Sequence, residues 1–343
     1  MRRSHWPHRE NFPKAMVALI AVGLALVLLY NTTAANDDTP KPQVVKTQPM
    51  SPWEFKRRLV GPITVIATPF DAGRNVDDDG VRNMVDRARR YGSQVFALTA
   101  GDSRYNTLTD DEIYKLTETL VRAANGKALT IAAANLWSKQ QVIDYALHAE
   151  RLGASAVQVL LPKNMDEADQ VEYYRDIANS TKLGIVLHGN FSESLLHKLV
   201  QIDSIVALKE DVGLKYAIDR QIVFGNRLAI FPGGSEARFL VGYPYGAQAY
   251  YSVFYQFAPE LGLKFWKLIQ AGKVKQAGEF VKKYDHPYMQ GWTQGRWHAS
   301  LEYFGVAPRY LRPPDKTFGP EEMAYLKKMF DAMGLKPEPR TQR

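Results

Sequence analysis

The sequence predicts an α/β chain that forms a (β/α)8 TIM barrel, with helices appended after the barrel and one transmembrane helix before it. Short β-branched runs alternate with segments of helical periodicity, which is typical of a parallel sheet. Eight such runs are present, the number that closes a barrel. An uncharged apolar segment near the N-terminus precedes this pattern.

Composition indicates a globular protein with a sizeable core, since 45% of the residues are hydrophobic and 23% are charged. The chain has no cysteine, which excludes disulfides, thiolate metal sites and cysteine nucleophiles. The formal net charge is +8, and residues 1–14 contribute +3 of it. The remaining charge is spread without a basic run or a nucleic-acid motif, so we expect no nucleic-acid partner.

Residues 15–30 form the uncharged segment, and a basic flank at 1–14 precedes them. A bilayer span takes about 20 residues, with about 17 as a lower limit. The residues just before the segment can supply the shortfall, and Tyr30 suits the opposite interface. We therefore expect a retained single-pass anchor, with the flank in the cytoplasm and the barrel in the periplasm. The alternative is a cleaved signal peptide with small residues at 33–35.

The next segment, 31–58, is polar and proline-rich, which predicts an extended tether. The barrel is expected at 59–272. Its predicted strands are Ile63–Thr68, Gln94–Leu98, Ala128–Ala133, Ala156–Leu161, Gly184–His188, Ser204–Lys209, Arg227–Phe231 and Gln248–Ser252. The helical patterns between them include Asp77–Tyr91, Thr109–Ala124, Ser138–Leu152 and Asp166–Ser180.

A helical extension at 273–335 and a frayed tail at 336–343 follow the barrel. Helices are predicted at Glu260–Ala271, Lys273–Tyr284 and Glu321–Met333. A doubly wound open sheet is the rival architecture. Two observations disfavour it: no G-x-G-x-x-G follows the first strand, and the strands number eight.

Four motifs lie in order along the predicted barrel. They are Thr68-Pro69-Phe70 after the first strand, Ala207-Leu208-Lys209-Glu210 in the sixth, Pro232-Gly233-Gly234-Ser235 after the seventh, and Gly246–Val253 with Ala258-Pro259-Glu260 around the eighth. In this order and spacing the chain resembles the dihydrodipicolinate synthase and N-acetylneuraminate lyase family. The resemblance implies a barrel whose lysine forms a Schiff base with a 2-keto acid, without a cofactor or a metal.

The resemblance assigns the Schiff-base role to Lys209, at the end of the sixth strand. Active sites of such barrels are built at that end, and a lysine there can attack a carbonyl as a free amine. The alternative is a lysine that only forms a salt bridge in the barrel mouth, for instance with Glu210. The predicted substrate-binding residues are Thr99, Gly101, Asp102, Ser103 and Gly233.

Two expected helpers of Lys209 are missing. Where the family has a tyrosine, after the fourth strand, this chain reads Leu160-Leu161-Pro162, and the relay threonine has become Ala100. Losing one positioned acid–base group costs about 10²–10⁴ in rate. His188, at the end of the fifth strand, is a candidate substitute base, with a satisfied structural histidine as the alternative. Tyr105 is a second candidate from the enlarged loop.

These losses, with the anchor, favour a non-catalytic accessory subunit of a larger membrane complex, such as an electron-transport or photosynthetic assembly. The expected partners are that complex and the lipid bilayer. Candidate contact residues are the aromatic clusters Tyr243–Tyr245, Tyr250–Tyr251 and Phe254–Tyr255, together with Trp53. The alternative is a divergent Schiff-base aldolase or lyase that acts on a 2-keto acid through Lys209. A keto-acid-binding protein is a third hypothesis.

Overall fold

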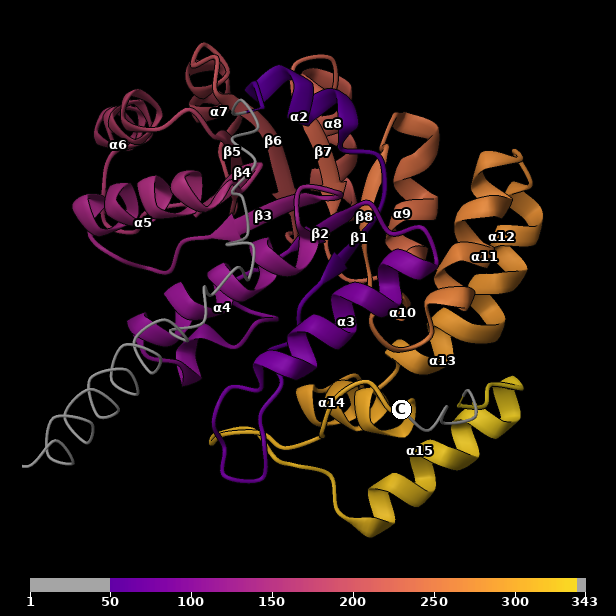
Figure 1. Cartoon of the computed structure of the whole chain (residues 1–343). Coiled ribbons are helices and arrows are strands. Elements are labelled where there is room, and N and C mark those ends of the chain that lie inside the picture. The colour runs from indigo at the N-terminus through magenta and orange to yellow at the C-terminus, as the bar shows by residue number, and fades with distance from the viewer. Residues whose placement is uncertain (1–49, 338–343) are drawn as a thin grey trace, which may run out of the picture. The chain divides into compact units, whose positions relative to one another are not determined.

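The computed structural model describes residues 50–337. Eight parallel strands form one sheet in the order β7-β6-β5-β4-β3-β2-β1-β8. The two end strands, β7 and β8, contact each other, so the sheet closes into a barrel (Figure 1). The predicted (β/α)8 barrel is therefore confirmed. Its strands are β1 (Gly61–Val65), β2 (Val95–Ala97), β3 (Leu129–Ala133), β4 (Ala156–Leu160), β5 (Gly184–His188), β6 (Ile205–Glu210), β7 (Ala229–Pro232) and β8 (Ala249–Ser252).

Helices cover the outside of the barrel, and several begin with side-chain caps. Thr109 and Ser138 each accept a hydrogen bond from the backbone three residues on and complete capping boxes. The helices up to β8 are α2 (Pro52–Arg58), α3 (Asp78–Arg90), α4 (Asp110–Ala124), α5 (Lys139–Leu152), α6 (Glu167–Ser180), α7 (Glu193–Leu199), α8 (Leu214–Phe224) and α9 (Glu236–Gly242). Short 3-10 turns lie at Tyr105–Thr107 and Tyr243–Tyr245.

Residues 52–58, predicted as the end of an extended tether at 31–58, form helix α2, and residues 31–49 lie outside the described part of the chain. Ser51 caps this helix by accepting a hydrogen bond from the Glu54 amide at 3.2 Å. Pro52 lies in the first turn, where the N–H that it lacks would have no helical partner. Phe55 is fully buried, and α2 packs against β5 and β6. In Figure 1, α2 lies at the opposite end of the barrel from α14 (Gln294–Tyr303).

The C-terminal extension contains more helices than the sequence predicted. After β8 come α10 (Phe254–Phe257), α11 (Pro259–Gln270), α12 (Val274–Phe280), a π-helical turn (Val281–Asp285), α13 (His286–Met289), α14 and α15 (Pro320–Met333). Aromatic contacts hold them to the barrel. The rings of Tyr288 and Phe330 both lie within 6 Å of Phe257, which belongs to α10. The extension is thus packed onto the barrel rather than trailing from it.

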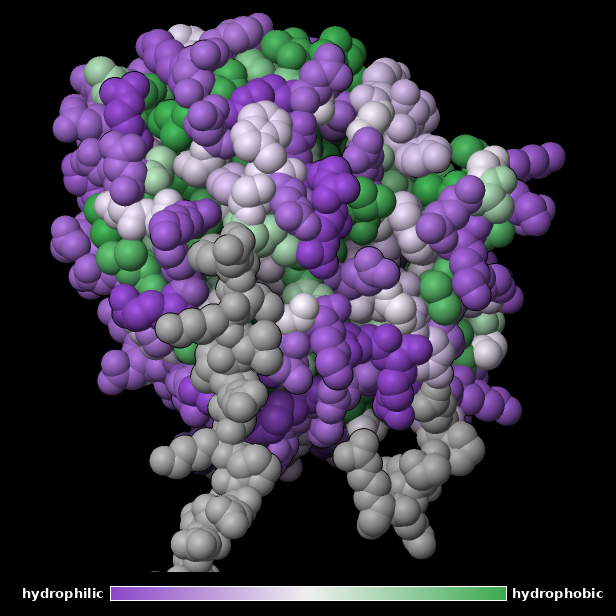
Figure 2. Space-filling model, turned by 45° about the horizontal axis from the view of Figure 1, so that its top comes forward, coloured by the Kyte–Doolittle hydropathy of each residue, from purple (hydrophilic) through white to green (hydrophobic). Residues whose placement is uncertain are grey.

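The predicted anchor at 15–30 and its flank at 1–14 lie outside the described residues. Within 50–337, no helix combines the length and apolar character needed to cross a membrane. Figure 2 shows one face of the molecule on which hydrophilic residues predominate and hydrophobic ones fall into separate groups.

Two of the predicted aromatic contact clusters are wrong, because their residues are buried. Alternation along β8 directs Tyr251 into the barrel and Tyr250 outward, where its ring stacks on Phe239 at 4.3 Å. The second cluster, Phe254 and Tyr255, is also buried. Of the remaining candidates, Tyr245 and Trp53 are each close to half exposed.

Candidate active site

The site is built around Lys209, the penultimate residue of β6. The residue is 3% exposed and lies at the carboxyl end of its strand. The strand pairing places Lys209 beside His188, the last residue of β5. Glu210 follows on the opposite face of the strand, where it is paired with Arg238 at 2.7 Å. The salt-bridge partner of Lys209 is therefore not Glu210.

Asp211 is the carboxylate that pairs with Lys209. Its Oδ2 contacts the Lys209 ammonium and lies 2.9 Å from Nε2 of His188. The Lys209 Nζ lies 3.1 Å from the same imidazole nitrogen. Desolvation at the barrel mouth raises the pKa of Asp211, but the hydrogen bond to His188 and the charge of Lys209 together lower it well below its usual value. Asp211 is thus held ionised between two nitrogen donors.

Burial lowers the pKa of His188, and the hydrogen bond to Asp211 only partly opposes this. The other imidazole nitrogen, Nδ1, lies 3.2 Å from the amide nitrogen of Gln158. An amide NH2 can only donate, so Nδ1 accepts and the proton of the neutral ring resides on Nε2. His188 accordingly donates to Asp211. The unprotonated ring nitrogen is therefore occupied by Gln158 and is turned away from Lys209.

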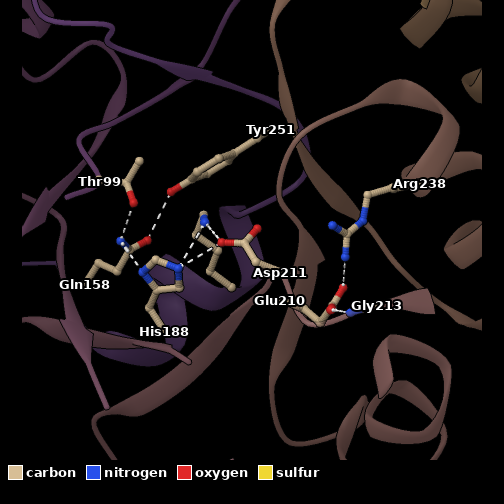
Figure 3. Close-up of polar contacts among 9 residues, drawn as sticks. Thr99, Gln158, His188, Glu210, Asp211, Gly213, Arg238 and Tyr251 are labelled. Carbon is tan, nitrogen blue, oxygen red and sulfur yellow. Dashed lines mark hydrogen bonds and ion pairs between the residues drawn. The ribbon is translucent and has the colours of Figure 1, made fainter. Parts of the chain in front are cut away.

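Gln158 is oriented by two further contacts across the barrel. Its Nε2 donates to Oγ1 of Thr99 at 2.9 Å, and its Oε1 accepts from the hydroxyl of Tyr251 at 3.1 Å. Figure 3 shows Gln158 between Thr99, Tyr251 and His188. The ring of Tyr251 also lies 5.1 Å from the Lys209 Nζ. A hydrogen-bonded chain therefore runs from β8 through β4 to the histidine of β5.

The turn after β2 supplies the other predicted residues. Thr99, Gly101 and Asp102 line the cavity above Lys209. Within the described part of the chain, the backbone N–H groups of residues 100–102 donate to no protein acceptor, and of these three residues Gly101 and Asp102 line the cavity. Desolvation raises the pKa of Asp102, against the opposing charge of Lys209. Ser103 lies behind the turn and donates to the Ile66 carbonyl at 2.6 Å, so its role is structural.

Gly233 provides space beside the lysine. A Cβ at this position would lie 1.9 Å from Oδ1 of Asp211 and 3.3 Å from the Lys209 Nζ. Its amide donates to the Glu210 carbonyl at 2.9 Å, which fixes the backbone there. Gly234, the next residue, lines the cavity with a φ of +100°. The glycine pair thus lets the chain pass close to the lysine and its carboxylate.

The cavity has a volume of about 250 Å³ and opens at the carboxyl ends of the strands. Lys209, His188 and Asp211 lie on its polar side. The apolar side comes partly from the C-terminal extension, through Met289, Trp292 and Trp297. Among residues 50–337, no group of three or more His, Asp or Glu side chains is placed to hold a metal ion.

A buried carboxyl pair lies next to the cavity wall. Glu236, the first residue of α9, accepts a hydrogen bond from the hydroxyl of Ser252 at 2.5 Å, and Ser252 lines the cavity. Asp285 of the π-helical turn accepts from the Ala237 amide at 3.0 Å. Burial, reinforced by the charge of Asp285, raises the pKa of Glu236 well above its ordinary value. Glu236 is therefore protonated under conditions that ionise an exposed glutamate.

Tyr105 does not line the cavity, although the sequence suggested it as a substitute for the missing tyrosine. It is buried, and burial raises its pKa well above the ordinary value, with Tyr145 as its neighbour. Gln158, Asp211 and Tyr251 were not among the residues predicted for the site. Gln158 carried a signal, as a polar residue in the otherwise apolar β4 run Ala-Val-Gln-Val-Leu.

This barrel and its lysine can be compared with known proteins. Residues 58–332 match the sequence pattern of the Dihydrodipicolinate synthetase family. The chain belongs to this family. The resemblance seen in the four motifs is thereby confirmed, and the dihydrodipicolinate synthetase match also includes the helices that follow the barrel.

Relatives within the family carry different activities in their names. The chain is 24% identical over 303 residues to the "Probable 5-dehydro-4-deoxyglucarate dehydratase" of Variovorax paradoxus, covering 83% of this chain and 99% of that protein. It is also 24% identical over 231 residues to the 4-hydroxy-tetrahydrodipicolinate synthase of Anaplasma marginale, covering 64% of this chain and 76% of the relative.

Solved structures support the fold. Dihydrodipicolinate synthase from Aquifex aeolicus superposes with a TM-score of 0.73 at 19% identity, over 82% of this chain and all of that one (100%). A prophage protein of the dihydrodipicolinic acid synthase family from E. coli K12, in complex with pyruvate, gives a TM-score of 0.72 at 18% identity, over 81% of this chain and 99% of that chain. At this identity the likeness establishes the barrel fold alone.

Proposed function

We propose that this chain is a lyase that forms a Schiff base between Lys209 and a 2-keto acid. The observation that carries the proposal is the buried amine of Lys209, which opens onto a cavity and shares a hydrogen-bonded cluster with Asp211 and His188. A lysine that served only as a structural ion pair would need neither the cavity nor the glycine pair beside it.

The turn at 99–102 provides the anchoring point for the keto acid. Its free backbone N–H groups and the hydroxyl of Thr99 are suited to a carboxylate, because they donate hydrogen bonds without adding a charge. A carboxylate held there places the adjacent keto carbon toward Lys209, which lines the same cavity. Holding the two reactants in this way converts a bimolecular step into an effectively unimolecular one.

The chemistry balances with the groups present. Asp211, the carboxylate in contact with Lys209, takes up the ammonium proton; its lowered pKa makes it a weak base, but the transfer removes the Lys209 charge, one of the two causes of that lowering. The free amine then adds to the keto carbon, and its proton passes to the former keto oxygen to give a carbinolamine. Asp211 returns the proton to the oxygen that departs as water, which leaves an iminium on Lys209. His188 donates to Asp211 throughout and acts as a positioning residue. This arrangement favours Asp211 over His188 as the proton carrier, and the role of His188 as a base stays a prediction.

Trapping the iminium tests the proposal directly. The full chain is incubated with pyruvate and sodium borohydride, and the labelled residue is located by peptide mass mapping. We expect one reduced pyruvyl group on Lys209 and none in Lys209→Ala. Lys215→Ala is the matched control, because Lys215 lies on the nearby exposed surface and its side chain is 88% exposed. A wild type that stays unlabelled, or a label that survives in Lys209→Ala, overturns the proposal.

One observation favours the non-catalytic accessory role predicted from the sequence. The end of β4 carries Leu160 and Leu161, and no tyrosine follows them before the helix α6. A folded wild type that remains unlabelled would support that role. Purification of the tagged full chain in mild detergent then tests for a stoichiometric membrane partner. The anchor and the periplasmic location remain predictions about residues outside the described part of the chain.

A further inference from the structure

We infer that the amino end of the barrel docks on an anionic membrane surface, with lipid phosphates held in a groove beside α2. This inference goes beyond the proposed function, because the Lys209 cavity opens at the carboxyl ends of the strands, and it holds whether or not Lys209 forms a Schiff base. It rests on the cations of the groove, on the exposed apolar side chains that border it, and on the place where the chain enters the described structure.

The groove lies between α2 and the amino ends of β7 and β8, and its volume is about 650 Å³. Helix α2 is held against the start of the sheet: a Cβ on Gly184, the first residue of β5, would lie 3.3 Å from the Phe55 ring. Lys56 Nζ donates to the carbonyl of Asn226, in the loop before β7, at 2.7 Å. We call this space the α2 groove; its lining includes Trp53, Lys56, Arg57, Gln221, Gly246 and Gln248.

Cations outnumber carboxylates around the α2 groove. Lys56 and Arg57 line it, and the Arg57 side chain is 78% exposed. Among the lining residues within 50–337 the one carboxylate is Glu54, which lies 3.8 Å from both Arg57 and Arg58. Burial lowers the pKa of Lys56, and the charge of Arg227 lowers it further. An anion in the groove would relieve this repulsion between like charges.

The two ends of the barrel differ in the sign of their charge. The loops that lead from a helix into the next strand carry three cations, Lys127, Lys182 and Arg227, and one carboxylate, Asp203. The loops that lead from a strand into the next helix carry five aspartates and three cations. The last turns of α2 and α3 add three basic residues each to the amino end. Cations there also suit the helix dipoles, so the charge alone does not identify a partner.

Exposed apolar side chains border the α2 groove and supply the second observation. Trp53 lines the groove and is close to half exposed. Ile222, which is 67% exposed, follows the lining residue Gln221. Tyr245, close to half exposed, precedes the lining residue Gly246. Figure 2 brings the end of the molecule with α2 and α8 toward the viewer and shows strongly hydrophilic residues beside hydrophobic ones there. Basic residues next to tryptophan, tyrosine and aliphatic side chains are typical of surfaces that bind at a membrane interface.

The chain enters the described structure at this same end, since residue 50 directly precedes the cap of α2. In the sequence, 19 residues separate it from the uncharged segment at 15–30. At ~3.6 Å per residue such a stretch reaches at most roughly 70 Å, so a bilayer that held the segment would keep the groove near its headgroups. An acidic peptide or a nucleic acid would satisfy the cations alone. A lipid surface offers phosphates beside hydrocarbon, which matches both the cations and the apolar border.

A fluorescent label on a single cysteine tests the docking in the full chain. The chain has no cysteine, so Tyr245→Cys places one label beside the groove, and Leu136→Cys places one at a 61% exposed position in the loop after β3. Each protein is added to vesicles of phosphatidylcholine, alone or mixed with phosphatidylglycerol. We expect the label at 245 to shift to the blue only with phosphatidylglycerol, and the label at 136 not to respond. Raising the salt from ~0.1 M to ~1 M should reverse the shift, because the Debye length falls from ~10 Å to ~3 Å.

Variants made in the Tyr245→Cys chain locate the contact. Arg57→Gln should weaken docking on the anionic vesicles about fivefold, the effect of one basic residue near such a surface. Ile222→Ser should weaken it roughly tenfold, through the loss of apolar burial. Lys163→Gln is the matched control, because it removes an exposed cation from the loop after β4, at the other end of the barrel, and it should change nothing.

Several results would overturn the inference. One is an equal response to neutral and anionic vesicles, or an equal response of the two labels. Another is the same blue shift with soluble polyglutamate in place of vesicles, which would identify a surface for polyanions in general. Docking that is unchanged in Arg57→Gln and Ile222→Ser, or weakened as much by Lys163→Gln, would place the contact outside the α2 groove.

Discussion

Replacing Gly233 by alanine should separate the chemistry of the site from the stability of the fold. The added methyl group would lie 1.9 Å from Oδ1 of Asp211, whereas real Cβ contacts essentially never fall below 3.0 Å. The carboxylate must therefore move by at least 1.1 Å, the difference between these distances. The backbone cannot give way easily, because β7 pairs with β6 up to Pro232 and the Gly233 amide is bonded to the Glu210 carbonyl.

The clashing atom, Oδ1, lies at the end of the Asp211 side chain at the barrel mouth. Asp211 can therefore rotate away at a small cost in folding free energy. We expect the free energy of unfolding to change by less than about 1 kcal/mol. The rate of pyruvate trapping on Lys209 should fall about 10²-fold, since a misplacement of about 1 Å has that effect on a positioned group.

Urea denaturation and the time course of borohydride trapping measure these two quantities. Gly278→Ala is the matched control: it adds the same methyl group to α12, where no atom lies within 4 Å, and it should leave trapping unchanged. Trapping at the wild-type rate in Gly233→Ala would show that the placement of Asp211 does not matter to the lysine.

Two predictions concern pH. Burial keeps the pKa of His188 below the ordinary 6.5, so the unfolded chain binds this proton more tightly than the folded chain does. Neutral His188 should therefore donate to Asp211 until the pH falls below 6.5, and the trapping rate should not depend on His188 above that pH. A fall in trapping rate that begins above pH 6.5 and disappears in His188→Asn would contradict this assignment. The pKa of Glu236 shifts in the opposite direction, above the ordinary 4.5, so the folded state binds this proton more tightly than the unfolded chain does. The free energy of unfolding should therefore fall as the pH rises from about 4.5 toward neutrality. Glu236→Gln keeps an acceptor for Ser252 and should flatten that slope in urea titrations at several pH values; an unchanged slope would refute the protonated assignment.

The sequence predicted the barrel well because each strand is a local signal. Buried parallel strands read as short β-branched runs, and seven of the eight observed strands, all except β1, end within one residue of the predicted end. Six of these seven also start at the predicted residue or one residue later, and β7 starts two residues later, at Ala229. The first strand differs most: β1 pairs with β8 from Gly61 and ends at Val65. Lys209 was assigned through the resemblance of the sixth-strand motif to the family, and its position at the end of a strand can be read from the sequence.

The remaining parts of the site depend on closure of the barrel. Gln158 and Tyr251 are 93 residues apart and meet because β4 and β8 face each other across the interior. Asp211 follows β6 directly, but its pairing with Lys209 depends on which way the chain turns after the strand. Trp292 and Trp297 reach the cavity only through the path of the C-terminal extension, and no local periodicity in the sequence predicts that path. Helix α2 was not predicted because Pro52 was read as part of the proline-rich segment, although Ser51 followed by Glu54 is a typical helix-capping pattern.

The cavity draws its two sides from different stretches of the chain, and this has a consequence for how such a protein diversifies. Lys209 belongs to a barrel strand, and Asp211 and the turn at 99–102 directly follow barrel strands, whereas Met289, Trp292 and Trp297 come after the barrel is complete. Changes in the later stretch can therefore alter which molecule is accepted without disturbing the bond-making groups. A family built in this way can retain one reaction while its members exchange substrates through drift in a segment that takes no part in the chemistry.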